Sequence, residues 1–159
     1  MKAEPQKEHQ WLQQLVGQWT YESDCSMGPD QPRQKFVGSE TVRSLGGLWV
    51  VCEGRGEMPG GGMAQMIMTL GYDPRQRRFV GTWIGSMMSH LWIYDGQLDA
   101  AEQTLSLAAE GPDFCAEGKM ARFRDVIQII NPDQRKLISH YFGPDGQWHE
   151  FMTAHYRRK

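Results

Sequence analysis

The chain has 159 residues, of which 17 are lysine or arginine and 19 are aspartate or glutamate, so its net charge is −2. This length is enough for one domain with a substantial hydrophobic core. The near balance of charge argues against nucleic acid as a partner, because nucleic-acid-binding domains carry a surplus of clustered basic residues.

The sequence has no apolar run of about 18 residues, the length that a membrane-spanning helix needs. The N-terminus is polar and lacks the apolar centre of a signal peptide, so we expect a cytoplasmic protein without a membrane partner. Cys25, Cys52 and Cys115 lie far apart and form no Cys-x-x-Cys motif, which argues against a disulfide framework or a zinc site. Free thiols, buried or half-buried, are the expectation.

One helix is predicted near the N-terminus, at residues 4–16. Pro5 suits a first helical position, and Gly17 is a typical helix stop. Four apolar residues of this segment recur at helical spacing: Trp11, Leu12, Leu15 and Val16. We expect this face to cover an open end of a sheet; a partner-binding helix is the alternative.

The rest of the chain alternates short runs of β-branched and aromatic residues with turn residues, as in an antiparallel meander. The predicted strands cover about residues 19–25, 34–45, 48–57, 63–72, 77–85, 87–94, 103–109, 119–130, 136–142 and 147–157. The predicted turns and loops include Gly28-Pro29-Asp30-Gln31-Pro32, Gly46-Gly47, Asp95-Gly96, Gly111-Pro112-Asp113 and Asn131-Pro132-Asp133.

About ten antiparallel strands would leave two unpaired edges unless the sheet closes on itself. The sequence therefore predicts an all-β fold, a single antiparallel up-and-down β-barrel over residues 19–158 with one N-terminal helix. A barrel with somewhat more than eight strands has interior room for a small ligand. The predicted cavity, rather than any motif, is the functional indication.

Several segments in order along the chain resemble a known family. Gly17-Gln18-Trp19 after a short helix resembles the opening of the calycin, or lipocalin-like, barrels. The chain as a whole resembles the bacterial domain of unknown function 1579 family. The similar segments include residues 9–19, Leu45-Gly46-Gly47 with Trp49, Gly71-Tyr72-Asp73, Thr82-Trp83-Ile84, Arg124-Asp125-Val126-Ile127, and Met152 with Tyr156.

The resemblance implies a lipocalin-like barrel and no established activity. An acidic residue often follows the Trp-Ile pair of the family pattern, whereas this chain has Gly85 after Trp83-Ile84. If that carboxylate has a function in relatives, this protein lacks it.

Alternation along the predicted strands gives a set of candidate cavity residues. Trp19 points inward in the lipocalin-like pattern, and Tyr21 would then share its face. The candidate ligand-binding residues are Trp19, Tyr21, Trp49, Glu53, Trp83, His90, Trp92, Tyr94, Arg124 and Met152. An aromatic and methionine-rich wall with a few polar anchors is typical of a small-molecule site. Glu53 is expected to pair with Arg124 or to anchor a ligand head group.

The leading hypothesis is therefore a protein that binds a small apolar molecule inside the barrel. Two alternatives use the same fold: an isomerase or hydrolase, and a scaffold whose barrel is filled by the tryptophans and methionines. No catalytic motif or metal-ligand spacing stands out, so we expect no cofactor and lean against an enzyme. A related class of ten-stranded barrels binds haem through one histidine, which keeps His90 and His140 as minor candidates. A homodimer is also compatible with the sequence.

Overall fold

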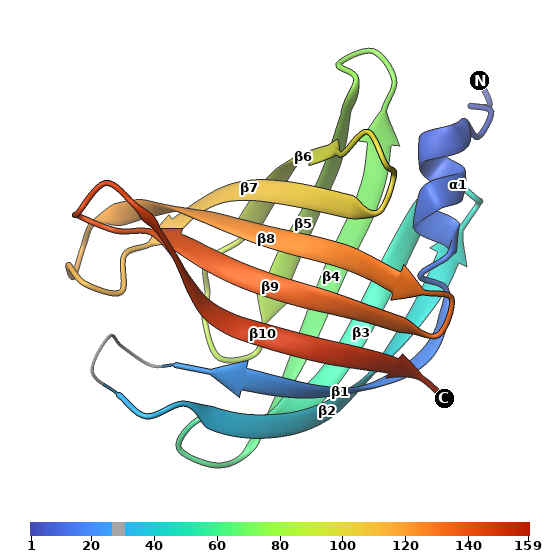
Figure 1. Cartoon of the computed structure of the whole chain (residues 1–159). Helices are drawn as coiled ribbons and strands as arrows, with labels where there is room; N and C mark the ends of the chain where they lie inside the picture. The colour runs from blue at the N-terminus through green and yellow to red at the C-terminus, as the bar shows by residue number, and fades with distance from the viewer. Residues whose placement is uncertain (27–30) are drawn as a thin grey trace.

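In a computed structural model of this protein, hydrogen bonds join each strand to its neighbours in sequence and join the first strand to the last. Figure 1 shows how the strands are arranged. The structure describes residues 1–26 and 31–159, which form one helix and ten strands. The elements are α1 (Lys7–Gln13), β1 (Gly17–Cys25), β2 (Gln34–Leu45), β3 (Trp49–Glu57), β4 (Met63–Asp73), β5 (Arg78–Gly85), β6 (Trp92–Leu98), β7 (Thr104–Pro112), β8 (Met120–Asn131), β9 (Gln134–Phe142) and β10 (Trp148–Arg158).

The predicted fold class is confirmed: the sheet is a closed up-and-down barrel in the order β1, β10, β9 and so on to β2. All strand pairs are antiparallel, and nine of the ten predicted strands match the observed ones closely. The loop predicted at Gly28-Pro29-Asp30-Gln31-Pro32 lies largely outside the described residues. The described residues contain no helix with the length and apolarity needed to cross a membrane.

The sixth strand differs from the prediction, since it covers Trp92–Leu98 rather than residues 87–94. The turn predicted at Asp95-Gly96 was wrong, because both residues lie inside β6. A Cβ atom on Gly96 would lie 2.7 Å from the Leu107 side chain and 3.0 Å from Cβ of Phe79. The glycine therefore permits close packing inside the barrel and does not mark a turn.

The helix is shorter than predicted, spanning Lys7–Gln13 instead of 4–16. The backbone N–H of Gln6 donates to Nδ1 of His9 at 2.9 Å, which fixes the start of the helix after Gln6. Beyond Gln13 the chain continues in tighter turns, with the Leu15 and Val16 amides bonded to carbonyls three residues earlier.

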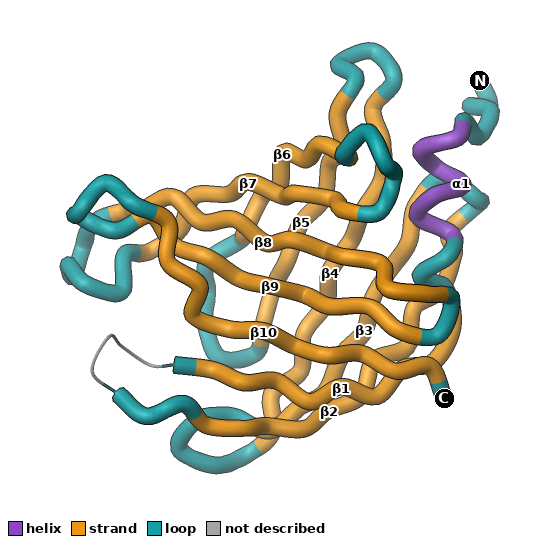
Figure 2. The backbone as a smooth tube through the Cα atoms, viewed as in Figure 1, coloured by secondary structure: helices purple, strands orange, loops and turns teal. Residues whose placement is uncertain are grey.

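The helix covers one end of the barrel, as predicted for its apolar face. Figure 1 shows α1 beside one end of β3 and β4, the strands that it contacts. Leu12, Leu15 and Trp19 are buried, and the Trp19 Nε1–H donates to the Leu15 carbonyl at 2.8 Å. This indole forms part of the packed floor of the barrel. The connections that follow β3, β5, β7 and β9 lie at the opposite end (Figure 2).

A buried ion pair lies next to this floor. Nη2 of Arg135 on β9 contacts Oε1 of Glu40 on β2, and the two side chains are only 4% and 14% exposed. The Arg135 guanidinium also stacks over the rings of Tyr156, at 3.9 Å, and Trp19, at 4.7 Å. The pair joins strands from opposite halves of the sequence across the barrel.

Replacing Leu12 with alanine should lower the free energy of unfolding by about 2–5 kcal/mol, because this fully buried side chain would leave a cavity under the helix. The matched control is Leu91→Ala, at a side chain that is 50% exposed, which should change stability by less than about 0.5 kcal/mol. Urea unfolding followed by circular dichroism measures both. Equal losses in the two variants would contradict the role of α1 as a packed cover.

Arg135→Met should cost about 3–5 kcal/mol, because it leaves the Glu40 carboxylate buried without its cation. Arg43→Met removes the partner of Glu53 from an exposed pair at 3.5 Å and should cost ~0–1 kcal/mol. The same unfolding assay compares the two arginine-to-methionine changes. A loss at position 43 as large as that at 135 would show that burial does not distinguish these pairs.

Candidate functional site

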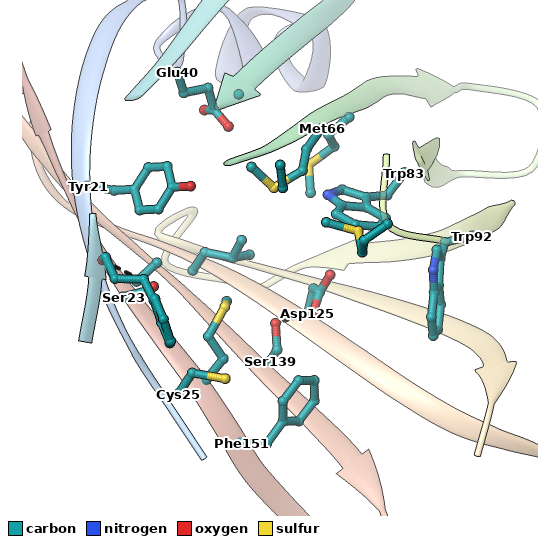
Figure 3. A pocket seen from close by; sticks show the side chains of 18 of the residues that line it. Tyr21, Ser23, Cys25, Glu40, Met66, Trp83, Trp92, Asp125, Ser139 and Phe151 are labelled. Atoms are coloured by element: carbon teal, nitrogen blue, oxygen red, sulfur yellow. Dashed lines mark hydrogen bonds between the residues drawn. The ribbon is translucent and has the colours of Figure 1, made fainter. Parts of the chain in front are cut away.

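A cavity of about 370 Å³ occupies the barrel interior. Side chains from every strand reach it, and Figure 3 shows those labelled around the open space. Apolar and sulfur-containing residues dominate its wall. They include Phe36, Cys52, Met58, Met66, Met68, Trp83, Met87, Met88, Trp92, Phe114, Phe123, Leu137, Phe151 and Met152.

The strand register brings these side chains together on the inner face. Met68 of β4 pairs with Trp83 of β5, and Trp83 pairs in turn with Trp92 of β6. Directly opposed residues of adjacent strands point to the same side of a sheet, so the three side chains form a continuous band. A Cβ atom on Gly111 would lie 2.1 Å from the Trp92 ring, so this glycine leaves the space that the indole occupies.

A polar cluster interrupts the apolar wall. Asp125 of β8 accepts a hydrogen bond from the Tyr94 hydroxyl at 2.5 Å and another from the Ser139 hydroxyl at 2.6 Å. Ser139 on β9 lies directly opposite Asp125 in the strand register, whereas Tyr94 reaches it from β6. All three line the cavity, and Figure 3 shows Asp125 and Ser139 side by side. Such short O–H···O distances are typical of hydrogen bonds to an ionised acceptor.

Burial shifts the pKa values of the titratable groups in this cluster. Desolvation raises the pKa of Asp125 even though the hydrogen bonds from Ser139 and Tyr94, and the nearby His140, act to lower it. The pKa of Tyr94 lies well above its usual value because the phenol is buried and next to Asp125. Burial, followed by Glu40 and Glu57, raises the pKa of Tyr21 to about 12. The cavity thus holds several titratable groups with raised pKa values.

Five of the predicted site residues line this cavity: Tyr21, Trp83, Trp92, Tyr94 and Met152. Trp19 is instead packed in the floor at the α1 end.

Two further residues that were predicted to bind a ligand, Trp49 and Glu53, lie on the outer face of β3. Trp49 is 40% exposed there, and Glu53 contacts Arg43. Cys52 and Gly54 of this strand line the cavity. Trp49 and Glu53 therefore share one face of β3, as predicted, but this is the outer face of the barrel and not the cavity face.

Arg124 and His90 also lie away from the cavity wall. The Arg124 guanidinium stacks over the Trp148 ring at 4.6 Å, and Glu53 pairs with Arg43. The predicted pairing of Glu53 with Arg124 was therefore wrong. The His90 Nε2–H donates to the Glu110 carbonyl at 2.9 Å. His140, the other minor haem candidate, places Nδ1 3.4 Å from the Arg124 carbonyl oxygen.

Sequence reasoning missed Asp125, Ser139 and Glu40 as cavity residues. For Asp125 the sequence held a signal, because the apolar residues Phe123 and Ile127 lie two positions before and after it on the same strand. The structure buries both of them. An acidic residue between two inward apolar residues is a candidate interior polar group. Ser139 had no comparable signal, since residues 137–142 are apolar at both parities.

The three cysteines are free thiols with different environments: Cys52 is buried, Cys25 is half-buried and Cys115 is exposed. The expectation of buried or half-buried thiols was therefore wrong for Cys115. Burial raises the pKa of Cys52, so this thiol stays protonated at neutral pH. Among residues 1–26 and 31–159, no group of three or more histidine, cysteine or acidic side chains is arranged to hold a metal ion.

Solved structures with the same architecture include natural and designed barrels. Rv2717c from M. tuberculosis has a TM-score of 0.69 at 11% identity, over 98% of this chain and 99% of that one. EF1p2_mFAP2b bound to DFHBI has a TM-score of 0.52 at 14% identity, over 96% and 99%. A fluorescence-activating β-barrel obtained by de novo design has a TM-score of 0.50 at 13% identity, over 92% and 95%.

At these low identities the structural likeness establishes the fold alone. No protein of curated function matches the sequence. A family described as "Protein of unknown function (DUF1579)" matches residues 4–158, which is nearly the whole chain. The chain therefore belongs to the DUF1579 family, as its sequence resemblance predicted.

Proposed function

We propose that this protein binds a small, largely apolar molecule in the interior of its barrel. The observation that carries the proposal is the cavity of about 370 Å³ inside a closed sheet. This volume lies in the range of about 300–1,000 Å³ that is usual for small-molecule sites. It favours a binding role over the alternative of a barrel filled by its own side chains.

The chemistry of the wall supports the same role. Met66, Met68 and Met152 are flexible and polarisable, so they can adapt to the shape of an apolar ligand. Trp83 and Trp92 offer broad aromatic surfaces. A small number of polar groups on an apolar wall is the usual way to orient a bound molecule.

Similar barrels support the proposal independently. EF1p2_mFAP2b was solved bound to DFHBI, and the de novo designed barrel is described as fluorescence-activating. A barrel of this architecture is therefore able to hold a small molecule, and we transfer only that capacity to this chain.

The neutral lipophilic dye prodan provides the test. Met66→Trp should weaken its binding at least about tenfold, because the indole would occupy the cavity. The matched control is Ile67→Trp, the next residue of β4, whose side chain is 38% exposed on the outer face. That variant should bind prodan within about twofold of the wild type.

Dye fluorescence and native mass spectrometry measure both affinity and stoichiometry. One dye per chain is expected. No binding to the wild type, or equal weakening by both tryptophan substitutions, would contradict an interior site.

As a second candidate function, we propose an enzyme that transfers a proton to or from a substrate bound in this cavity. The favouring observation is the carboxyl of Asp125, whose pKa is raised by burial beside two hydroxyl groups that could contact a substrate. Groups with shifted pKa values around one pocket are common at catalytic sites. Asp125 would act as the base and Tyr94 as the hydrogen-bond donor.

This second candidate depends on the raised pKa of Asp125, which has a measurable consequence. The folded protein holds the Asp125 proton more tightly than the unfolded chain does. The wild type should therefore lose stability relative to Asp125→Asn as the pH rises above about 3.9, the ordinary value for aspartate. Urea unfolding of both proteins between about pH 3.5 and 8 measures the difference. A difference that grows in favour of the wild type over this range would show a lowered pKa instead.

A further inference from the structure

The charges on the cavity wall are of one sign. Among the described residues that line it, Glu40, Glu57 and Asp125 are acidic, and none is lysine, arginine or histidine. The four residues at 27–30 add no basic side chain, because they are methionine, glycine, proline and aspartate. An anionic ligand such as a fatty acid would therefore meet carboxylates and no cation.

Asp125 differs from the other two acids in its burial and its partners. Glu57 is exposed and accepts a hydrogen bond from the backbone N–H of Val37 at 3.2 Å. Glu40 is paired with the buried Arg135 next to the floor of the barrel.

None of the ion pairs among the described residues involves Asp125. Its carboxylate accepts hydrogen bonds from the hydroxyl groups of Tyr94 and Ser139, and His140 is near enough to act on its charge without forming an ion pair. Two hydroxyl donors do not neutralise a buried carboxylate, which normally needs a cation.

The Asp125 carboxylate also has unused acceptor capacity. An ionised carboxylate has about four lone-pair sites, and here each oxygen accepts one hydrogen bond. Because Asp125 lines the cavity, the remaining sites are available to a molecule inside it. An ammonium group carries up to three donors and the positive charge that the site lacks.

The surrounding rings favour a cation as well. The indole rings of Trp83 and Trp92 and the ring of Phe123 lie on the same wall. Aromatic faces attract cations, and the attraction is strongest where water is excluded. The cavity thus combines a carboxylate without an ion-pair partner, unused acceptor positions and aromatic side chains in its wall.

We propose that the cavity selects lipophilic amines, with the protonated nitrogen at Asp125 and the apolar part between Met66, Met68 and Trp83. This inference rests on the proposed interior binding function and adds the class of ligand. Tyr94 and Ser139 hold the carboxylate oriented toward the ligand, so they act as positioning residues.

Three probes with one apolar body and different ends test the proposal: 4-phenylbutylamine, 4-phenylbutanol and 4-phenylbutanoate. Isothermal titration calorimetry at pH 7.5 should show the amine binding at least about tenfold more tightly than the alcohol, because the ammonium adds a Coulombic attraction to the carboxylate that the neutral hydroxyl lacks. The carboxylate should bind most weakly. Equal binding of amine and alcohol, or tighter binding of the carboxylate, would overturn the amine proposal.

Asp125→Asn keeps the size of the side chain and removes its charge. It should abolish the preference for the amine over the alcohol and leave the affinity for the alcohol within about threefold, which also shows that the variant is folded. The matched control is Asp95→Asn on β6, an outer acid that is 55% exposed and pairs with Arg78. This control should retain the full preference. Persistence of the preference in Asp125→Asn would overturn the proposal.

The prodan experiment distinguishes a failure of the amine proposal from a failure of the proposed interior binding function. If prodan binds inside the barrel but none of the phenylbutyl probes does, or they bind without an amine preference, the ligand class is wrong and the binding function stands. If neither prodan nor the three probes bind, both proposals fail.

Discussion

Hydrogen bonding between β1 and β10 is the constraint on which the rest of this structure depends. These strands pair from Trp19 opposite Arg158 to Cys25 opposite Met152, which leaves the sheet without a free edge. Because the sheet is closed, alternate side chains of each strand point into the barrel or out toward its surface. Tyr21 and Tyr156, from strands at opposite ends of the sequence, thereby meet with their ring centres 5.1 Å apart.

One end of the barrel interior is filled by packed side chains, and the rest contains a cavity. At the α1 end, Leu12, Leu15 and Trp19 are buried, and the ion pair of Arg135 with Glu40 completes the floor. Beyond this floor, methionine and aromatic side chains surround a cavity instead of filling it. Burying Asp125 in that region raises its pKa, which is a stability cost at neutral pH that a bound cation would offset. The same residue thus links the electrostatics of the fold to the proposed choice of ligand.

The sequence predicted the fold well because its signals are local. Period-two patterning and turn residues located nine of the strands, and the need to pair their edges predicted closure. Gly96 was misread because glycine marks turns and also permits close packing inside a sheet.

The site was predicted only in part, because the face on which a strand places its residues depends on register with its neighbours. On β3, Trp49 and Glu53 were assigned to the interior although they lie outside, and the inner face is formed by the smaller residues Val50, Cys52 and Gly54. Asp125 and Ser139 become a pair only through the register of β8 with β9, which no local pattern encodes.

The central claim is that the barrel contains accessible apolar space, and a crystal structure of the protein under xenon pressure tests it most directly. Xenon enters empty apolar cavities and is easily seen in electron density. We expect xenon inside the barrel beside Met66 and Met68, where the cavity wall is methionine-rich. An interior without xenon, occupied by the side chains of Trp83, Trp92 and the methionines, would contradict the account.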